Sequence, residues 1–96
     1  MKRDQIIEGL KRFKARSQDK YSILRIGVFG SAARDSMGKD SDLDVVVMLE
    51  NQDLFKLIGI KQDLEEEFRL PVDVVSYRDK MNQLLKRRID DEAVYV

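Results

Sequence analysis

A glycine–serine pair and two closely spaced acids lie in the middle of the chain, in a pattern that suits phosphate chemistry. Gly30 and Ser31 are followed by ten residues and then by Asp42-Leu43-Asp44, which opens an apolar run over residues 45–49. Glycine lets a phosphate approach the backbone closely, and carboxylates two residues apart on a strand face the same way. These are the parts needed to hold a nucleotide triphosphate and its magnesium ion.

Paired carboxylates at the start of a strand point to a metal ion. Two carboxylates within a few ångströms of each other resist joint ionisation, and a divalent cation relieves that repulsion. Ligands that are all oxygens favour a hard ion such as Mg²⁺ or Mn²⁺. Asp73, near the start of the next predicted strand, supplies a third acid. We therefore predict that Asp42, Asp44 and Asp73 bind the metal and form the catalytic centre.

The corner at Gly30 and Ser31 is predicted to bind phosphate. We expect a short helix over residues 32–37 with Ser31 as its N-cap, and the first N–H groups of a helix are free to donate to an anion. The Ser31 hydroxyl adds a donor, and the guanidinium of Arg34 can pair with phosphate oxygens. An acidic side chain of the third predicted helix is an alternative partner for Arg34. Gly30, Ser31 and Arg34 are therefore the predicted nucleotide-binding residues.

The composition excludes several other kinds of active site. The chain has no cysteine and no histidine, which rules out disulfides, zinc sites built from thiolates or histidines, and triads that use histidine. Gly38-Lys39 is not the end of a Walker A loop, because Ala33 stands where that loop needs a glycine. The acids at positions 40, 42 and 44 do not begin an EF-hand loop, because Val45 stands where glycine is required.

Length and charge indicate one small domain that spans residues 1–96. A chain of 96 residues can bury one modest core. Its net charge of zero gives no general reason to expect direct binding to nucleic acid. The first residues are charged and no apolar run approaches the ~20 residues of a membrane span, so we expect no signal peptide, no membrane partner and a cytoplasmic location. The basic first twenty residues and the acidic residues 40–67 are either solvated helix faces or, alternatively, a partner surface or a focused cation site.

The spacing of apolar residues predicts elements in the order α-β-α-β-α-β-α. Apolar residues every three or four positions indicate helices, and short runs rich in valine and isoleucine indicate strands. The predicted helices cover residues 3–17, 32–37, 54–68 and 79–89. The predicted strands cover residues 23–29, 42–49 and 72–76. The apolar tail, residues 93–96, is expected to pack against the domain or to meet a partner.

The chemistry of the predicted site fixes the strand directions. The connection between the second and third strands contains a helix, as a parallel crossover requires, and this places Asp73 beside Asp42 and Asp44. Gly30 lies at the end of the first strand, so that strand must run antiparallel to the second if Gly30 is to reach the same end of the sheet. We therefore predict an α+β domain with a three-stranded mixed sheet and flanking helices.

These residues resemble a known superfamily. The pair Gly30-Ser31, ten residues and then Asp42-Leu43-Asp44 is similar to the signature of the DNA polymerase β-like nucleotidyltransferases. The surrounding sequence resembles the smallest members, the minimal nucleotidyltransferases (MNT), which form the antitoxin half of HEPN–MNT pairs. The resemblance implies the polymerase β-like nucleotidyltransferase fold. It also implies that Asp42 and Asp44 are the metal-binding pair, that Asp73 is the third acid and that Gly30-Ser31 is the phosphate-binding corner.

The resemblance implies an enzyme that transfers AMP. It would use ATP and two Mg²⁺ ions, attack the α-phosphorus with a hydroxyl, and release pyrophosphate. The acceptor implied by the family is a tyrosine of a partner HEPN toxin, which makes the protein an adenylyltransferase that acts as an antitoxin. An alternative is a non-catalytic module that neutralises its partner by covering it, with the basic first helix and the apolar tail as contact candidates. Transfer to a small molecule is a weaker alternative.

Overall fold

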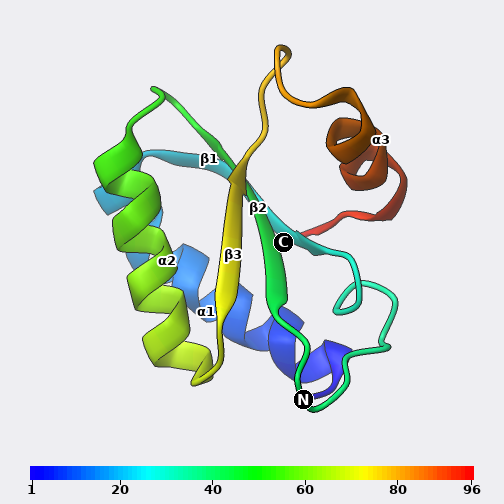
Figure 1. Ribbon diagram of the computed structural model, residues 1–96. Helices are drawn as coiled ribbons and strands as arrows, with labels where there is room; N and C mark the ends of the chain where they lie inside the picture. The colour runs from blue at the N-terminus through cyan, green and yellow to red at the C-terminus, as the bar shows by residue number, and fades with distance from the viewer.

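Three helices and four strands follow one another in the order α1, β1, β2, α2, β3, α3 and β4 (Figure 1). The structure is a computed structural model that describes residues 1–96. The helices are α1 (Arg3–Tyr21), α2 (Leu54–Phe68) and α3 (Gln83–Glu92). The strands are β1 (Ile23–Phe29), β2 (Leu43–Leu49), β3 (Val72–Ser76) and β4 (Val94–Tyr95). None of the helices is long and apolar enough to cross a membrane.

The strands form one mixed sheet in the order β3-β2-β1-β4. β1 pairs with β2 antiparallel, and β2 pairs with β3 parallel through the crossover that contains α2. The predicted mixed sheet and both strand directions are therefore confirmed. They bring the end of β1 and the starts of β2 and β3 to one end of the sheet.

The sheet has a fourth strand that the sequence did not predict. Val94 and Tyr95 pair antiparallel with Val28 and Gly27 of β1. A Cβ on Gly27 would lie only 2.5 Å from the carbonyl oxygen of Val94 and 2.9 Å from the Cα of Tyr95, so the missing side chain of Gly27 is what lets the tail approach. Of the two expectations for the tail, packing against the domain is therefore the one that the structure bears out.

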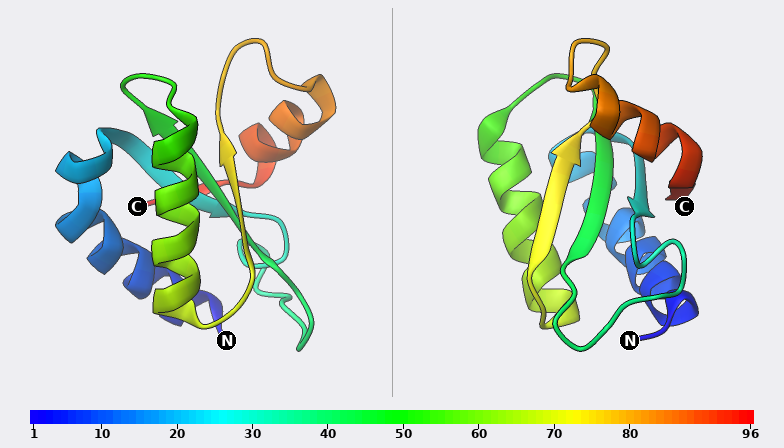
Figure 2. Two further views of the ribbon diagram at one scale, coloured as in Figure 1. Left: turned by 60° about the vertical axis from the view of Figure 1, so that its left-hand side comes forward. Right: turned by 45° about the vertical axis from the view of Figure 1, so that its right-hand side comes forward.

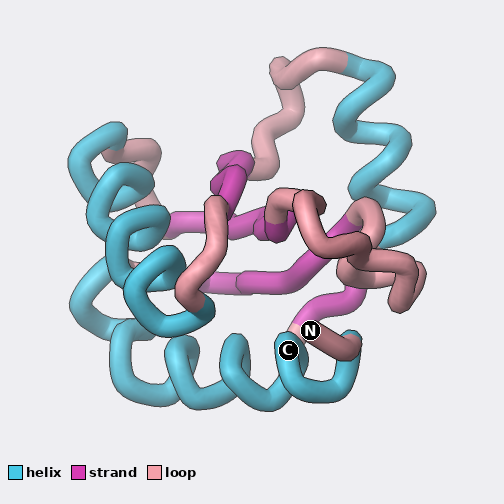
Figure 3. The backbone as a smooth tube through the Cα atoms, turned by 60° about the horizontal axis from the view of Figure 1, so that its bottom comes forward, coloured by secondary structure: helices cyan, strands magenta, loops and turns pink.

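Alternation along β2 divides the side chains between two cores. The odd positions Leu43, Val45, Val47 and Leu49 are buried in the larger core with α1 and α2. Val46 points the other way, into a smaller core that contains Met81 and Ile89. Figure 3 shows the strands between the layer formed by α1 and α2 and the separate helix α3. Because side chains alternate along a strand, Asp44 emerges on the same face as Val46, the face toward α3.

The segment between β1 and β2 is a looped turn, and the predicted helix over residues 32–37 is wrong. Residues 30–35 form turns, and Asp35 adopts a left-handed conformation with φ of 55° that ends any helical course. The Asp35 carboxylate accepts a hydrogen bond of 3.0 Å from the backbone N–H of Arg3. This contact holds the loop near the start of α1, as the right-hand view of Figure 2 shows.

The last helix lies further along the chain than predicted. α3 covers Gln83–Glu92 instead of residues 79–89. Its start is set by Asn82, whose side-chain oxygen accepts a 3.0 Å hydrogen bond from the N–H of Leu85. Met81 is buried in the smaller core but precedes the helix. The C-terminal turn of α3 therefore consists of residues 88–92, and this turn contacts the end of β1 at Gly30.

Candidate active site

Asp44 occupies the centre of the candidate site. In the sheet it lies opposite Asp73 of β3 on one side and opposite Phe29 of β1 on the other. Asp44 and Asp73 therefore project from neighbouring parallel strands on one face, which is the arrangement that the sequence predicted. Asp42 lies two residues before Asp44 in the exposed approach to β2.

Gly30 follows Phe29 directly and is packed against Asp44. Its φ is +69°, a conformation that side chains rarely adopt. A Cβ at this position would overlap the Asp44 carboxylate and would lie 3.2 Å from the Nη2 atom of Arg88. The structure therefore requires glycine here for two reasons, the backbone conformation and the space taken by an acid and a guanidinium.

Burial and two neighbouring carboxylates disfavour the charged form of Asp44. Burial raises the pKa of its carboxyl, and the neighbouring Asp73 and, more weakly, Asp42 raise that pKa further. Arg88 and Arg34 act in the opposite direction but do not cancel the effect. The pKa of Asp44 is consequently above its usual value. A bound divalent cation would relieve this repulsion, so the electrostatics fit the predicted metal.

The raised pKa of Asp44 predicts a pH dependence of folding. The folded protein holds this proton to higher pH than the unfolded chain, so the free energy of unfolding should fall as pH rises from about 4 through the folded-state pKa. Asp44→Asn should lack this part of the decline and should be more stable than the wild type at pH 7. Urea denaturation of both proteins from pH 4 to 7, without divalent metal, measures the difference.

Asp91→Asn is the matched control for this pH series. Asp91 is exposed on α3 and forms neither an ion pair nor a side-chain hydrogen bond in the structure. Asp91→Asn removes one negative charge, as Asp44→Asn does. It should leave the wild-type pH dependence of the free energy of unfolding in place. Equal slopes for the wild type and Asp44→Asn would contradict the assigned charge environment.

The carboxylates of the candidate site suit a cation that takes its remaining ligands from the substrate and from water. The structure contains no group of three or more carboxylates already arranged to hold a metal ion. Mg²⁺ in phosphoryl-transfer sites commonly takes one or two carboxylates and fills its remaining positions with phosphate oxygens and water. Asp44 and Asp73, side by side on adjacent strands, match that requirement, and Asp42 is close enough to affect the Asp44 carboxyl.

Ser31 begins a turn and does not cap a helix, so the predicted N-cap role is wrong. Its carbonyl oxygen accepts a 2.8 Å hydrogen bond from the backbone N–H of Ser36, which folds the chain back on itself. The argument from a helix dipole therefore does not apply at this corner. Ser31 nevertheless follows Gly30 directly, and its hydroxyl forms no hydrogen bond within the protein.

Arg34 already has an anionic partner. Its Nη1 atom donates a 2.6 Å hydrogen bond to the carboxylate oxygen Oε1 of Glu92. The acidic side chain thus comes from α3, not from the third predicted helix. The same oxygen of Glu92 accepts a 3.2 Å hydrogen bond from the backbone N–H of Gly30.

Arg88 and Glu92 also lie at the candidate site, although the sequence did not predict it. They lie four positions apart on α3 and are paired, with 4.0 Å between Arg88 Nε and Glu92 Oε2. The only signal in the sequence is this helical spacing of opposite charges, which is typical of exposed pairs anywhere. Contact with residues 30–44 could not be inferred from it.

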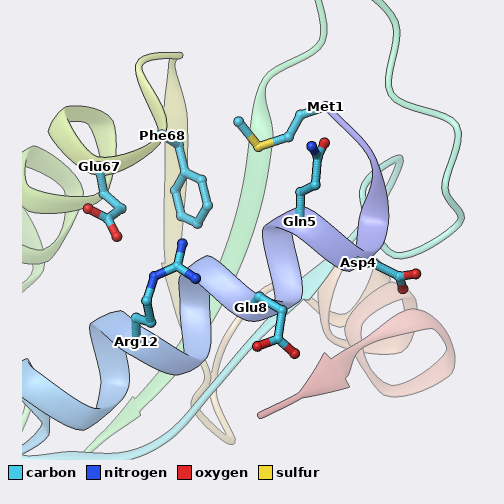
Figure 4. Close-up of a pocket in the computed structure, with 7 residues that line it drawn as sticks. All are labelled: Met1, Asp4, Gln5, Glu8, Arg12, Glu67 and Phe68. Atoms are coloured by element: carbon cyan, nitrogen blue, oxygen red, sulfur yellow. The ribbon is translucent and has the colours of Figure 1, made fainter.

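A separate groove lies between α1 and the end of α2. Figure 4 shows its lining residues, Met1, Asp4, Gln5, Glu8, Arg12, Glu67 and Phe68. The predicted metal-binding and nucleotide-binding residues are all absent from this lining. We therefore assign the chemistry to the end of the sheet and not to this groove.

Comparison with known proteins gives a family match over most of the chain. The model of the nucleotidyltransferase domain matches residues 9–96. A Methanocaldococcus jannaschii protein, MJ0435, named as a candidate protein adenylyltransferase, is 40% identical over 78 residues, covering 80% of this chain and 83% of its own. Protein adenylyltransferase MntA of Thermococcus cleftensis is 32% identical over 88 residues, covering 91% of this chain and 88% of its own.

Solved structures share the fold. One described as a candidate minimal nucleotidyltransferase has a TM-score of 0.79 at 28% identity and covers 98% of this chain and 95% of its own. A toxin–antitoxin structure with AMP-PNP has a TM-score of 0.72 at 18% identity and covers 99% and 72% of the two chains. A complex of the tri-AMPylated Shewanella oneidensis HEPN toxin with its MNT antitoxin has a TM-score of 0.62 at 19% identity and covers 97% and 66%.

Proposed function

The chain belongs to the nucleotidyltransferase domain family, and on that premise we propose that it transfers AMP from ATP to a hydroxyl group of a partner protein. The relatives MJ0435 and MntA, whose names give protein adenylyltransferase as their activity, support this choice of reaction. The AMPylated HEPN toxin found with a protein of the same fold supports a HEPN toxin as the partner. The protein is then an antitoxin that acts by modifying its toxin in the cytoplasm.

The single observation that carries the proposal is the pairing of Asp44 with Asp73 beside Gly30. Two carboxylates on adjacent parallel strands offer ligands for Mg²⁺, and the glycine corner next to them has a backbone N–H that binds an anionic oxygen, that of Glu92 in the structure. Metal chemistry and phosphate binding therefore meet at one end of the sheet. A family member without this pairing would have the fold but no place for the reaction.

The residues of the chain have distinct roles in the reaction. Asp42, Asp44 and Asp73 would hold Mg²⁺, which when bound offsets charge on the triphosphate and on the entering and leaving oxygens. Gly30, Ser31 and Arg34 would position the phosphates. The acceptor oxygen, for which we propose a tyrosine hydroxyl, gives up its proton to the carboxylate of Asp73 and forms a bond to the α-phosphorus as the bond to pyrophosphate breaks. Most of the rate enhancement would come from positioning and electrostatic stabilisation.

The first test is binding of a nucleotide in the absence of the acceptor protein, so that no AMP can be transferred. AMP-PNP with Mg²⁺ should raise the melting temperature, because a ligand that binds only the folded state stabilises it by about 2.7 kcal/mol at one hundred times its Kd. Chelation of Mg²⁺ by EDTA should abolish most of the shift. An unchanged melting temperature at millimolar MgAMP-PNP would contradict the proposed site.

The position of the label distinguishes adenylyl transfer from phosphoryl transfer. With the HEPN partner present, label from [α-³²P]ATP should appear on the partner, while label from [γ-³²P]ATP should leave with pyrophosphate. Treatment of the product with a phosphodiesterase should release AMP. Transfer of the γ-label would overturn the proposed reaction, even if nucleotide binding had been confirmed.

A further inference from the structure

Glu92 of α3 lies where the proposed nucleotide needs an anion-binding site. One oxygen of its carboxylate, Oε1, accepts hydrogen bonds from the Gly30 backbone N–H (3.2 Å) and from Nη1 of Arg34 (2.6 Å). The other oxygen is 4.0 Å from Nε of Arg88. Two hydrogen-bond donors and a third, ion-paired cation thus converge on one carboxylate, and its side chain is only 24% exposed.

This set of donors is the kind that binds phosphate. A backbone N–H at a glycine with positive φ and two guanidinium groups together form an anion cradle, because both kinds of donor bind oxyanions of any origin. A carboxylate oxygen and a phosphate oxygen present the same acceptor to that cradle. The two anions cannot occupy it together, since like charges at hydrogen-bond distance repel strongly.

Arg88 lies close enough to Gly30 to contact a phosphate that replaces the Glu92 carboxylate. Its Nη2 atom is 3.2 Å from the point where a Cβ of Gly30 would stand. Its guanidinium carbon lies 5.6 Å from the centre of the Phe29 ring, which keeps the side chain at the end of β1. The helix α3 therefore brings one cation and one anion to the corner.

We propose that Glu92 occupies the phosphate subsite of the nucleotide-free protein and that a phosphate of the incoming nucleotide displaces it and takes over Gly30 N–H, Arg34 and Arg88. The inference rests on the proposed function, because it assumes that the corner binds a triphosphate. Under this proposal, the Glu92 carboxylate competes with the nucleotide for the same donors. Arg88 becomes a phosphate ligand that lies outside the sequence motif. The affinity for nucleotide then depends partly on the fraction of molecules in which Glu92 has moved away from Gly30 and Arg34.

The test is equilibrium binding of MgAMP-PNP and of inorganic tripolyphosphate to the full chain, measured by calorimetry. Glu92→Gln should bind both probes more tightly, by about tenfold if the corner is open one-tenth of the time in the wild type. Arg88→Gln should bind both more weakly, also by about tenfold, because it loses a charge-assisted contact. Adenosine binding should not change in either variant.

Two further variants keep the test decisive. Asp91→Asn removes the same charge one residue away, and it should bind the probes as the wild type does. Glu92→Asp keeps the charge but shortens the side chain, so it should give an affinity between those of the wild type and Glu92→Gln and replaces that variant if the latter does not fold.

The outcomes separate this inference from the proposed function. Unchanged or weaker binding by Glu92→Gln, with normal binding by the wild type, would overturn the role of Glu92 and leave the proposed function in place. Equal tightening by Asp91→Asn would also overturn it, because the effect would then be one of overall charge. Failure of the wild type and of every variant to bind MgAMP-PNP would overturn both.

Discussion

Replacing Asp42 and Asp44 together by asparagine should lower the rate of AMP transfer by a factor of about 10³ or more, because the stabilisation lost with a bound metal amounts to several kcal/mol and each 1.36 kcal/mol is tenfold in rate. Asparagine keeps the shape of aspartate but carries no charge and binds Mg²⁺ poorly. Initial rates of label transfer from [α-³²P]ATP to the HEPN partner, at saturating nucleotide, measure the effect.

Unfolding is not the expected cause of lost activity in this variant. Burial and the carboxylate of Asp73 raise the pKa of Asp44, so removal of the Asp44 charge should make the metal-free protein more stable at neutral pH. The matched control is Asp40→Asn, an exposed acid in the preceding turn with neither an ion pair nor a side-chain hydrogen bond in the structure. The control should retain wild-type activity, and transfer that persists in the double variant would remove Asp42 and Asp44 from the catalytic centre.

The same double variant separates catalysis from neutralisation by simple binding. When it is produced together with the toxin, cell growth should be inhibited, because an unmodified toxin remains active even if a complex forms. Co-purification of the two proteins shows whether the complex is still made. Normal growth without AMP on the toxin would favour the alternative, an antitoxin that acts by covering its partner.

The pairing of Asp44 with Asp73 was predictable because it depends on two strong regularities. Side chains alternate along a strand, and a helix-containing crossover joins parallel strands with a known direction. Both rules apply to residues within one short stretch of sequence, from the end of β1 to the start of β3. The register that places Asp44 opposite Asp73 confirms the reasoning.

The remainder of the site depends on contacts between distant parts of the chain. β4 has only two residues, too few to show alternation, and it forms because Gly27 leaves room for Val94 and Tyr95. The helix α3 ends at Glu92, two residues before this strand, and there Glu92 reaches Gly30 and Arg34. The sequence shows only a helix with opposite charges four positions apart, which is the pattern of an ordinary surface pair.

The turn after β1 could not be predicted for a different reason. Ser31 followed by two alanines and an arginine favours a helix by local propensity. In the structure the loop is instead held by Asp35, which takes a left-handed conformation and accepts a hydrogen bond from Arg3 of α1. A tertiary contact thus overrides local preference, and the corner that we propose as the phosphate site offers Gly30 and side-chain cations in place of a helix terminus.

Gly30→Ala should impair both the fold and nucleotide binding. The methyl group would overlap the carboxylate of Asp44 and crowd Arg88, and alanine is strained at a φ of +69°. We expect a loss of about 1–3 kcal/mol in the free energy of unfolding, the usual cost of overpacking. We also expect the affinity for MgAMP-PNP to fall by about tenfold or more, because the displaced carboxylate is a proposed metal ligand. Urea denaturation and calorimetry measure the two effects.

Gly38→Ala provides the matched control, because a Cβ there would meet nothing closer than Ser41 Oγ at 3.6 Å, an ordinary contact. A double-mutant cycle then separates backbone strain from the collision with the carboxylate. In an Asp44→Ala background the collision with the carboxylate disappears, while the backbone strain and the close approach to Arg88 remain, so Gly30→Ala should cost less stability than it does in the wild type. Additive costs would mean that the requirement for glycine comes from φ and from Arg88, and that Gly30 and Asp44 are not in the contact on which the proposed site depends.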